Sequence, residues 1–108
     1  MTEKVPRVLA DYFAATNAHD VERMLAAFTN DATVRDEGRD HVGVTAIRAW
    51  MNETIEKYDY RVEPIEASRD GSTSVVLVWL RGKFPRSPIT LQYAFTISGE
   101  RVTRLEIG

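Results

Sequence analysis

The spacing of the apolar residues changes near residue 60, and this change restricts the fold more than any other feature of the sequence. Before it, apolar residues recur at intervals of three and four, as on one face of a helix. After it, they alternate with polar residues, as on a half-buried strand. In a chain of 108 residues, this order predicts one α+β domain over residues 1–108, with helices packed as a layer on a sheet.

Capping and turn signals divide the first part of the chain into short elements. Pro6 fits the first turn of a helix, where its missing N–H costs little, and Asp20 fits an N-cap. Gly43 precedes a third helical stripe. The elements predicted here are a helix over 5–16, a helix over 20–28, a strand over 32–36, a charged turn over 37–41 that leaves room for a minor strand near Arg39, and a helix over 44–58.

Four strands are predicted in the second part of the chain. Pro64 interrupts the first of them and indicates an edge strand or a bulge. The second is apolar on both faces, so we expect both faces to be covered. The strands run over 60–68, 73–81, 89–97 and 102–107, and a tight hairpin turn is predicted at 98–100.

Charge and composition exclude several classes of function. The net charge is −2 and no basic block is present, so no nucleic-acid partner is expected. The absence of cysteine excludes disulfides, thiol catalysis and cysteine metal sites. No run has the length of a membrane span and the first residues lack the apolar core of a signal peptide. We therefore expect a cytoplasmic protein with no membrane partner and no cofactor.

Five segments carry a resemblance to a known superfamily. They are YFAATNAHD at 12–20, FTNDATVRD at 28–36, GVTAIRAW at 43–50, GKFPRSP at 82–88 and LQYAF at 91–95. Over nearly its whole length the chain resembles the nuclear transport factor 2-like superfamily, which includes ketosteroid isomerases, and within it the SnoaL-like subgroup. The resemblance implies a cone-shaped barrel in which three N-terminal helices pack on a strongly curved antiparallel sheet around a pocket.

The resemblance also assigns the two faces of the sheet. One face lines the pocket and the other often forms a homodimer. The pocket would suit a small, mostly hydrophobic molecule held by a few polar groups. The polar row expected on the dimer or solvent side is Thr90, Gln92, Ala94 and Thr96. The residues predicted to bind the ligand are Trp50, Trp79, Leu91, Tyr93 and Phe95.

Asp36 is the strongest candidate for a catalytic residue, because it follows an apolar strand and precedes a charged turn. A carboxylate near apolar walls has a raised pKa, which suits a general base near neutral pH. The resemblance places here the aspartate with which ketosteroid isomerases abstract a proton beside a carbonyl. Two alternatives stay open: Asp36 is solvated and pairs with Arg35 or Arg39, or Glu37 takes its role.

Two further residues are predicted to assist Asp36. The resemblance places Tyr12 where the isomerases keep a tyrosine that binds the developing oxyanion, although Tyr12 also fits the packing stripe of the first helix. His41 would relay a proton or orient Asp36, and the alternative is an exposed turn histidine. No metal site is predicted, because the spacing of Asp36, Glu37 and His41 matches no strong motif.

One departure from the isomerases limits the prediction of function. Their second acid, which completes the oxyanion hole, aligns with Leu91, and leucine donates no hydrogen bond. The sequence therefore predicts a small-molecule pocket protein that acts as an isomerase, cyclase, lyase or hydrolase through Asp36 on a small hydrophobic carbonyl compound. The alternative is a non-catalytic ligand-binding or dimeric accessory protein.

Overall fold

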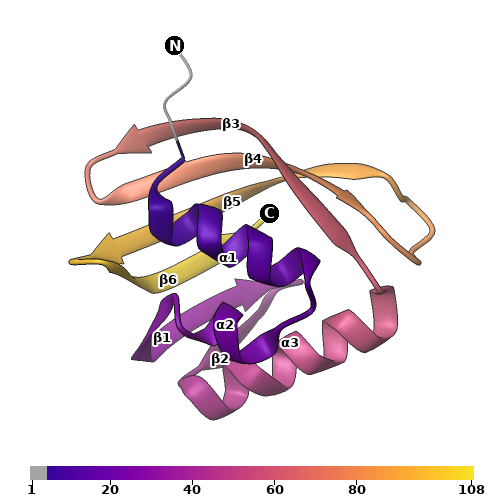
Figure 1. Ribbon diagram of the computed structural model, residues 1–108, viewed down its shortest axis with the longest axis horizontal. Helices are drawn as coiled ribbons and strands as arrows, with labels where there is room; N and C mark the ends of the chain where they lie inside the picture. Colours follow the sequence, from indigo (N-terminus) through magenta and orange to yellow (C-terminus); the bar gives the residue numbers. More distant parts are fainter. Residues whose placement is uncertain (1–4) are drawn as a thin grey trace.

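The computed structural model describes residues 5–108, which form helices packed on a curved six-stranded sheet (Figure 1). This confirms the α+β class. No helix in this part of the chain is long and apolar enough to cross a membrane. In chain order the elements are α1 Arg7–Asn17, α2 Val21–Leu25, β1 Phe28–Asp36, β2 Arg39–Val42, α3 Val44–Tyr58, β3 Arg61–Asp70, β4 Thr73–Arg81, β5 Ile89–Ser98 and β6 Arg101–Ile107.

The helix ends follow the predicted capping signals, with one exception. The Asp20 carboxylate accepts a hydrogen bond from the Arg23 backbone N–H at 3.2 Å and caps α2. The prediction that this helix continues to Phe28 was wrong, since α2 ends at Leu25. Phe28 pairs with Val102 of β6 instead, and the Val102 N–H donates to the Ala27 carbonyl at 2.7 Å. Pairing with a distant strand thus overrides the helical spacing.

The sheet has the strand order β2-β1-β6-β5-β4-β3. The β1–β6 pair is parallel and the other four pairs are antiparallel. A register shift between Pro64 and Glu66 confirms the bulge that Pro64 predicted in β3. The minor strand near Arg39 is β2, so the predicted turn over 37–41 shrinks to Glu37 and Gly38, both with positive φ. This hairpin leaves Asp36 as the last residue of β1.

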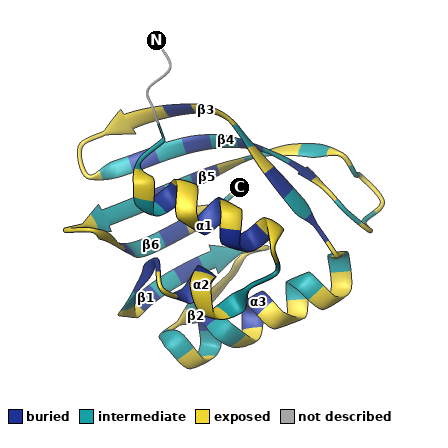
Figure 2. Cartoon of the chain, viewed as in Figure 1, coloured by how far each residue is buried: buried dark blue, intermediate teal, exposed yellow. Residues whose placement is uncertain are grey.

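The two faces of the sheet differ in how far the helices cover them (Figure 2). On β4, Val76, Val78 and Leu80 are buried, whereas Val75, Leu77 and Trp79 are half-buried. Successive side chains of a strand point to opposite faces, so the first row faces the helices and the second faces outward. Both faces of this strand were expected to be covered, and the outer one is covered only in part.

The helices fill only one end of the inner face. Under α1, aromatic rings pack edge to face: the ring centroid of Tyr12 lies 5.6 Å from those of Phe13 and Phe28 and 5.8 Å from that of Phe95. Phe95 is completely buried there. Toward the C-terminal end of α3 the inner face opens into a cavity.

Candidate functional site

The cavity has a volume of about 310 Å³ and lies between the end of β1, α3, the strands β4 to β6 and the loop that joins β4 to β5. Its walls are mainly apolar, with Leu80, Ile89, Leu91 and Ile107 contributed by the strands. Two carboxylates and one guanidinium are the charged groups of its lining, from Asp36, Glu37 and Arg86. The aromatic side chains of the wall are Trp50, Tyr58, Tyr60, Phe84 and Tyr93.

Asp36 reaches this cavity from the end of β1. The indole Nε1 of Trp50, on α3, donates a hydrogen bond to Asp36 Oδ2 at 3.0 Å. Burial raises the pKa of Asp36 above its ordinary value of 3.8, against the opposing effect of the Trp50 hydrogen bond; nearby Glu37 raises it and His41 lowers it. A carboxyl group in this setting takes and returns a proton closer to neutral pH than a solvated aspartate does.

The alternative in which Asp36 pairs with a neighbouring arginine is not what the structure shows. Arg35 pairs with Asp40, with Nη1 and Oδ1 3.0 Å apart. Arg39 lies in β2 and is exposed. Within residues 5–108, none of the ion pairs includes Asp36. The carboxylate therefore faces the cavity without a cationic partner.

Two of the three tyrosines that line the cavity with Asp36, Tyr60 and Tyr93, are buried. Burial is the main cause that raises the pKa of Tyr60 to about 12, and the neighbouring Thr54 hydroxyl opposes it. Burial also raises the pKa of Tyr93 well above its ordinary value, with a smaller contribution from the Asp36 charge. Both phenols are therefore protonated at neutral pH and are available as hydrogen-bond donors.

Tyr60 was missed as a site residue in the sequence. It directly precedes β3, and it alternates with Arg61 and Val62 so that Tyr60 and Val62 are buried and Arg61 is only half-buried. That alternation was the available signal. Tyr60 was placed at the start of the predicted strand over 60–68, but alternation alone does not say which face of a strand lines a cavity.

The predicted ligand-binding residues fall into two groups. Trp50, Leu91 and Tyr93 line the cavity. Phe95 is on the same inner row of β5 but lies in the filled core beneath α1. Trp79 lies outside the cavity altogether, because its neighbour Leu80 faces the cavity and adjacent side chains of a strand point in opposite directions.

The two predicted helpers of Asp36 lie outside the cavity wall. Tyr12 is buried among the rings under α1, which matches its alternative interpretation as a core residue. His41, on β2, is half-buried, and its ring centroid lies 5.9 Å from that of Trp50. His41 thus contacts the indole that binds Asp36. The residues described contain no cluster of three or more metal-ligating side chains.

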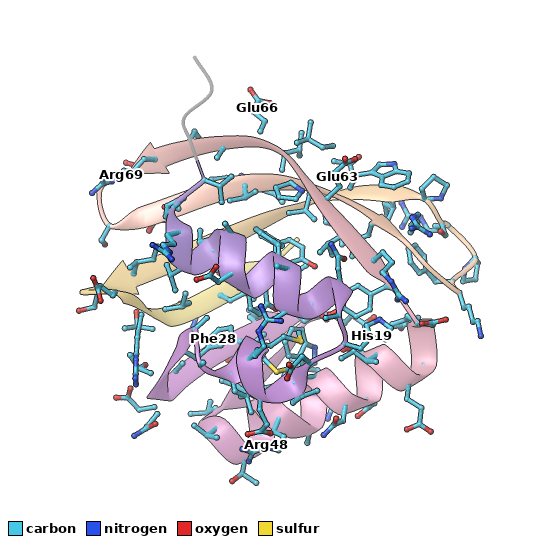
Figure 3. The ribbon with its side chains drawn as sticks, viewed as in Figure 1. His19, Phe28, Arg48, Glu63, Glu66 and Arg69 are labelled. Carbon is cyan, nitrogen blue, oxygen red and sulfur yellow. The ribbon has the colours of Figure 1, made fainter. Side chains whose placement is uncertain are left out.

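The mouth of the cavity is formed by the end of α3 and the β4–β5 loop. The Tyr58 hydroxyl donates to Glu37 Oε1 at 3.0 Å, and the Tyr58 and Phe84 rings meet edge to face with centroids 5.9 Å apart. A Cβ at Gly82 would lie 2.6 Å from the Tyr58 carbonyl oxygen, so only glycine lets the loop start this close to α3. His19, labelled in Figure 3, lies at the same end of α3, with its Nδ1 3.8 Å from Oδ1 of Asp59, the C-cap residue.

The comparisons with known proteins agree with this architecture. Residues 9–105 match the SnoaL-like domain family. A candidate polyketide cyclase from Sinorhizobium meliloti is 39% identical, with a TM-score of 0.93 over 96% of this chain and 95% of that one. A search of curated proteins finds no match.

Two solved structures of lower identity share the fold. A protein from Catenulispora acidiphila with a ketosteroid isomerase-like fold, in complex with trimethylamine, is 20% identical, with a TM-score of 0.84 over 97% of this chain and 86% of that one. The epoxide hydrolase/cyclase-like enzyme SalBIII is 23% identical, with a TM-score of 0.81 over 93% and 85%. The chain belongs to the SnoaL-like family.

Proposed function

We propose that this protein is an enzyme that isomerises or cyclises a small hydrophobic carbonyl compound, with Asp36 as its general acid and base. One observation carries the proposal: the Asp36 carboxylate lines an apolar cavity, is held by the Trp50 indole and has a raised pKa. A base of this kind is suited to the proton beside a carbonyl. The family relation to a candidate polyketide cyclase supports the same class of reaction.

The mechanism follows from how the carboxylate is held. Trp50 occupies Oδ2, so Oδ1 is the oxygen available to accept a proton from the substrate carbon beside the carbonyl. The electron pair of that C–H bond moves toward the carbonyl oxygen, which becomes an enolate oxygen. Tyr60 or Tyr93 donates a hydrogen bond to it, in place of the acid that Leu91 cannot supply. In a β,γ-unsaturated substrate, protonated Asp36 then returns the proton to the γ-carbon of the dienolate. In a cyclisation, the enolate carbon instead attacks a second carbonyl carbon of the substrate, the π bond of that carbonyl opens, and protonated Asp36 gives its proton to the resulting alkoxide.

Exchange of carbon-bound hydrogen with solvent tests this proposal. Wild-type protein and Asp36→Asn would be incubated in D₂O with a panel of small cyclic ketones, and deuterium uptake beside the carbonyl would be followed by NMR. We expect Asp36→Asn to lower the exchange rate by about 10²–10⁴-fold, because a positioned base contributes that much. The amide keeps the shape of the side chain, so affinity for a neutral ketone should not change. Equal exchange by both proteins would remove Asp36 from the mechanism.

A non-catalytic ligand-binding protein is the second candidate. The mostly apolar wall of the cavity favours it, since such a wall binds a small molecule without any chemistry. TerC, a protein of the same fold that is 17% identical, was co-crystallised with polyporic acid. Ketones that bind without exchange in wild-type protein would favour this candidate.

We also propose that the outer face of the sheet forms a homodimer. Val75, Leu77 and Trp79 are half-buried on that face, and β5 sets Gln92 opposite Leu77 and Thr90 opposite Trp79. A lysine at position 77 would place an unpaired charge in such an interface. Leu77→Lys should give monomers in sedimentation at concentrations where the wild type is dimeric, and a monomeric wild type would contradict the proposal. The cytoplasmic location stays a prediction.

A further inference from the structure

The Asp36 carboxylate is half-buried and has no ion-pair partner among residues 5–108. Its surroundings raise its pKa chiefly by desolvation. Taking a charge even partly out of water is costly unless an opposite charge pairs with it. The cavity therefore favours either a proton on Asp36 or a positively charged group beside it.

The walls around this carboxylate are suited to a cation that is large and weakly hydrated. Trp50, Tyr60 and Tyr93 line the same cavity as Asp36, and Tyr58 and Phe84 stand at its mouth. The face of an aromatic ring carries negative potential and attracts a cation within about 6 Å of its centroid, and aromatic cages bind quaternary ammonium groups in this way. A metal ion is less suited, because it requires several oxygen or nitrogen ligands.

One ring of the cavity wall has an ammonium group over it. Lys57 Nζ lies 5.1 Å from the centroid of the Tyr58 ring, and the Tyr58 hydroxyl donates a hydrogen bond to Glu37. A side-chain hydrogen bond with Tyr58 is the main cause that raises the pKa of Lys57, and Glu37 adds a smaller effect. Trp50 and Asp36 likewise place an aromatic ring beside a carboxylate in the cavity wall.

We propose that the ligand of this cavity carries a tertiary or quaternary ammonium group on an apolar body, with the ammonium group held between Asp36 and the aromatic wall. The inference rests on the proposed function and deepens it, because it narrows the substrate to a carbonyl compound that bears such a group. Among residues 5–108, Arg86 is the one cation of the cavity lining, and its side chain is exposed on the β4–β5 loop. With both carboxylates ionised, the charged side chains of the lining therefore carry a net negative charge.

Two probes of the same shape test the preference for charge. Choline and 3,3-dimethylbutan-1-ol differ in one atom, the ammonium nitrogen, which is carbon in the alcohol. Titration into ¹⁵N-labelled protein would follow the indole N–H signal of Trp50, which Trp79→Phe identifies. We expect choline to bind at least tenfold tighter than the alcohol near pH 8, and Asp36→Asn to abolish the difference.

Glu66→Gln is the matched control, since Glu66 is exposed on β3 and points away from the molecule (Figure 3). It removes the same charge and should leave the preference for choline intact. Equal affinities of wild-type protein for the two probes would overturn the inference, as would a preference that survives Asp36→Asn.

The pH dependence of wild-type binding gives a second test that needs no variant. Affinity for choline should fall as the pH is lowered through the pKa of Asp36, whereas affinity for the alcohol should stay constant; a constant affinity for choline would contradict the inference. Glu37 is the second carboxylate of the cavity lining, so repeating the binding measurements with Glu37→Gln separates its contribution. The other titratable or charged groups near Asp36 are His41, Tyr60, Tyr93 and Arg86.

The inference and the proposed function fail separately. Deuterium exchange that depends on Asp36, without any preference for choline, would overturn the ammonium ligand and leave the enzyme. A preference for choline that depends on Asp36, without exchange in any ketone, would leave the ammonium site and remove the proposed reaction.

Discussion

The two ends of the inner sheet face are built from the same kinds of residue and have different properties. Under α1, Tyr12, Phe13 and Phe95 interlock edge to face and fill the space. Beside α3, Trp50 and Tyr60 surround a cavity of about 310 Å³. Aromatic content is therefore no guide to where the core ends and a binding site begins. The two ends also differ in charge, because the carboxylate of Asp36 lines the open end.

The largest expected effect is on stability at the filled end. Phe95→Ala removes a completely buried ring, and we expect it to lower the free energy of unfolding by about 3–5 kcal/mol through lost burial and a new cavity. Leu91→Ala at the open end should cost about 1 kcal/mol, because a half-buried leucine loses less burial and the cavity already exists. Urea denaturation measures both, and equal losses would contradict the distinction.

The next effect concerns the two classes of tyrosine. Tyr60→Phe removes a hydroxyl in the cavity, and we expect it to lower the rate of deuterium exchange by about 10²-fold, as for the loss of one oxyanion donor. Tyr12→Phe should change the rate little, because Tyr12 lies in the filled core. A larger loss in Tyr12→Phe than in Tyr60→Phe would reverse the assignment and restore the role first predicted for Tyr12.

A smaller effect is expected in how stability depends on pH. Because the folded-state pKa of Asp36 is raised from 3.8, the native state binds more protons than the unfolded state between the two pKa values, and ionisation costs stability as the pH rises through this window. Asp36→Asn removes that cost. Its stability relative to wild type should increase from below pH 3.8 to a plateau above the raised pKa. Urea denaturation at several pH values measures it, and a constant difference would contradict a raised pKa.

The smallest effect tests the groups that hold Asp36. Trp50→Phe removes a hydrogen bond to the ionised carboxylate, so the pKa of Asp36 should rise further, and deuterium exchange should begin at higher pH. His41→Gln should shift the profile in the same direction by less, since His41 ranks below Trp50 among the causes that lower this pKa. A shift to lower pH in either variant would contradict the assignment.

Local pattern predicted most of the fold because the pattern and the tertiary structure agree. Strand β4 was predicted over 73–81 and found there, since apolar residues, several of them β-branched, follow one another through it without interruption. The second helix was predicted too long because Phe28 continues its helical spacing. Phe28 instead pairs in parallel with Val102 of β6, more than 70 residues away in the sequence. The residues next to Phe28 in the sequence do not indicate this pairing.

The sequence predicted several residues that line the cavity, but it did not predict which side of each strand faces the cavity. Asp36 was singled out from its place after an apolar strand, and the structure places it in the cavity; its catalytic role stays a prediction. Trp79 was assigned to the wall wrongly because alternation gives two faces and does not say which one is inside. Tyr60 was overlooked for the same reason, although it was placed at the start of the predicted strand over 60–68.

The most direct test of the account is the titration of the Asp36 carboxyl carbon by ¹³C NMR, with Asp36→Asn to identify its signal. The central claim is that this carboxylate lines an apolar cavity, has no ion-pair partner among residues 5–108, and accepts a hydrogen bond from the Trp50 indole. The account predicts a pKa above 3.8 that rises further in Trp50→Phe. A pKa at or below 3.8 would show a solvated or ion-paired carboxylate and would contradict the proposed site.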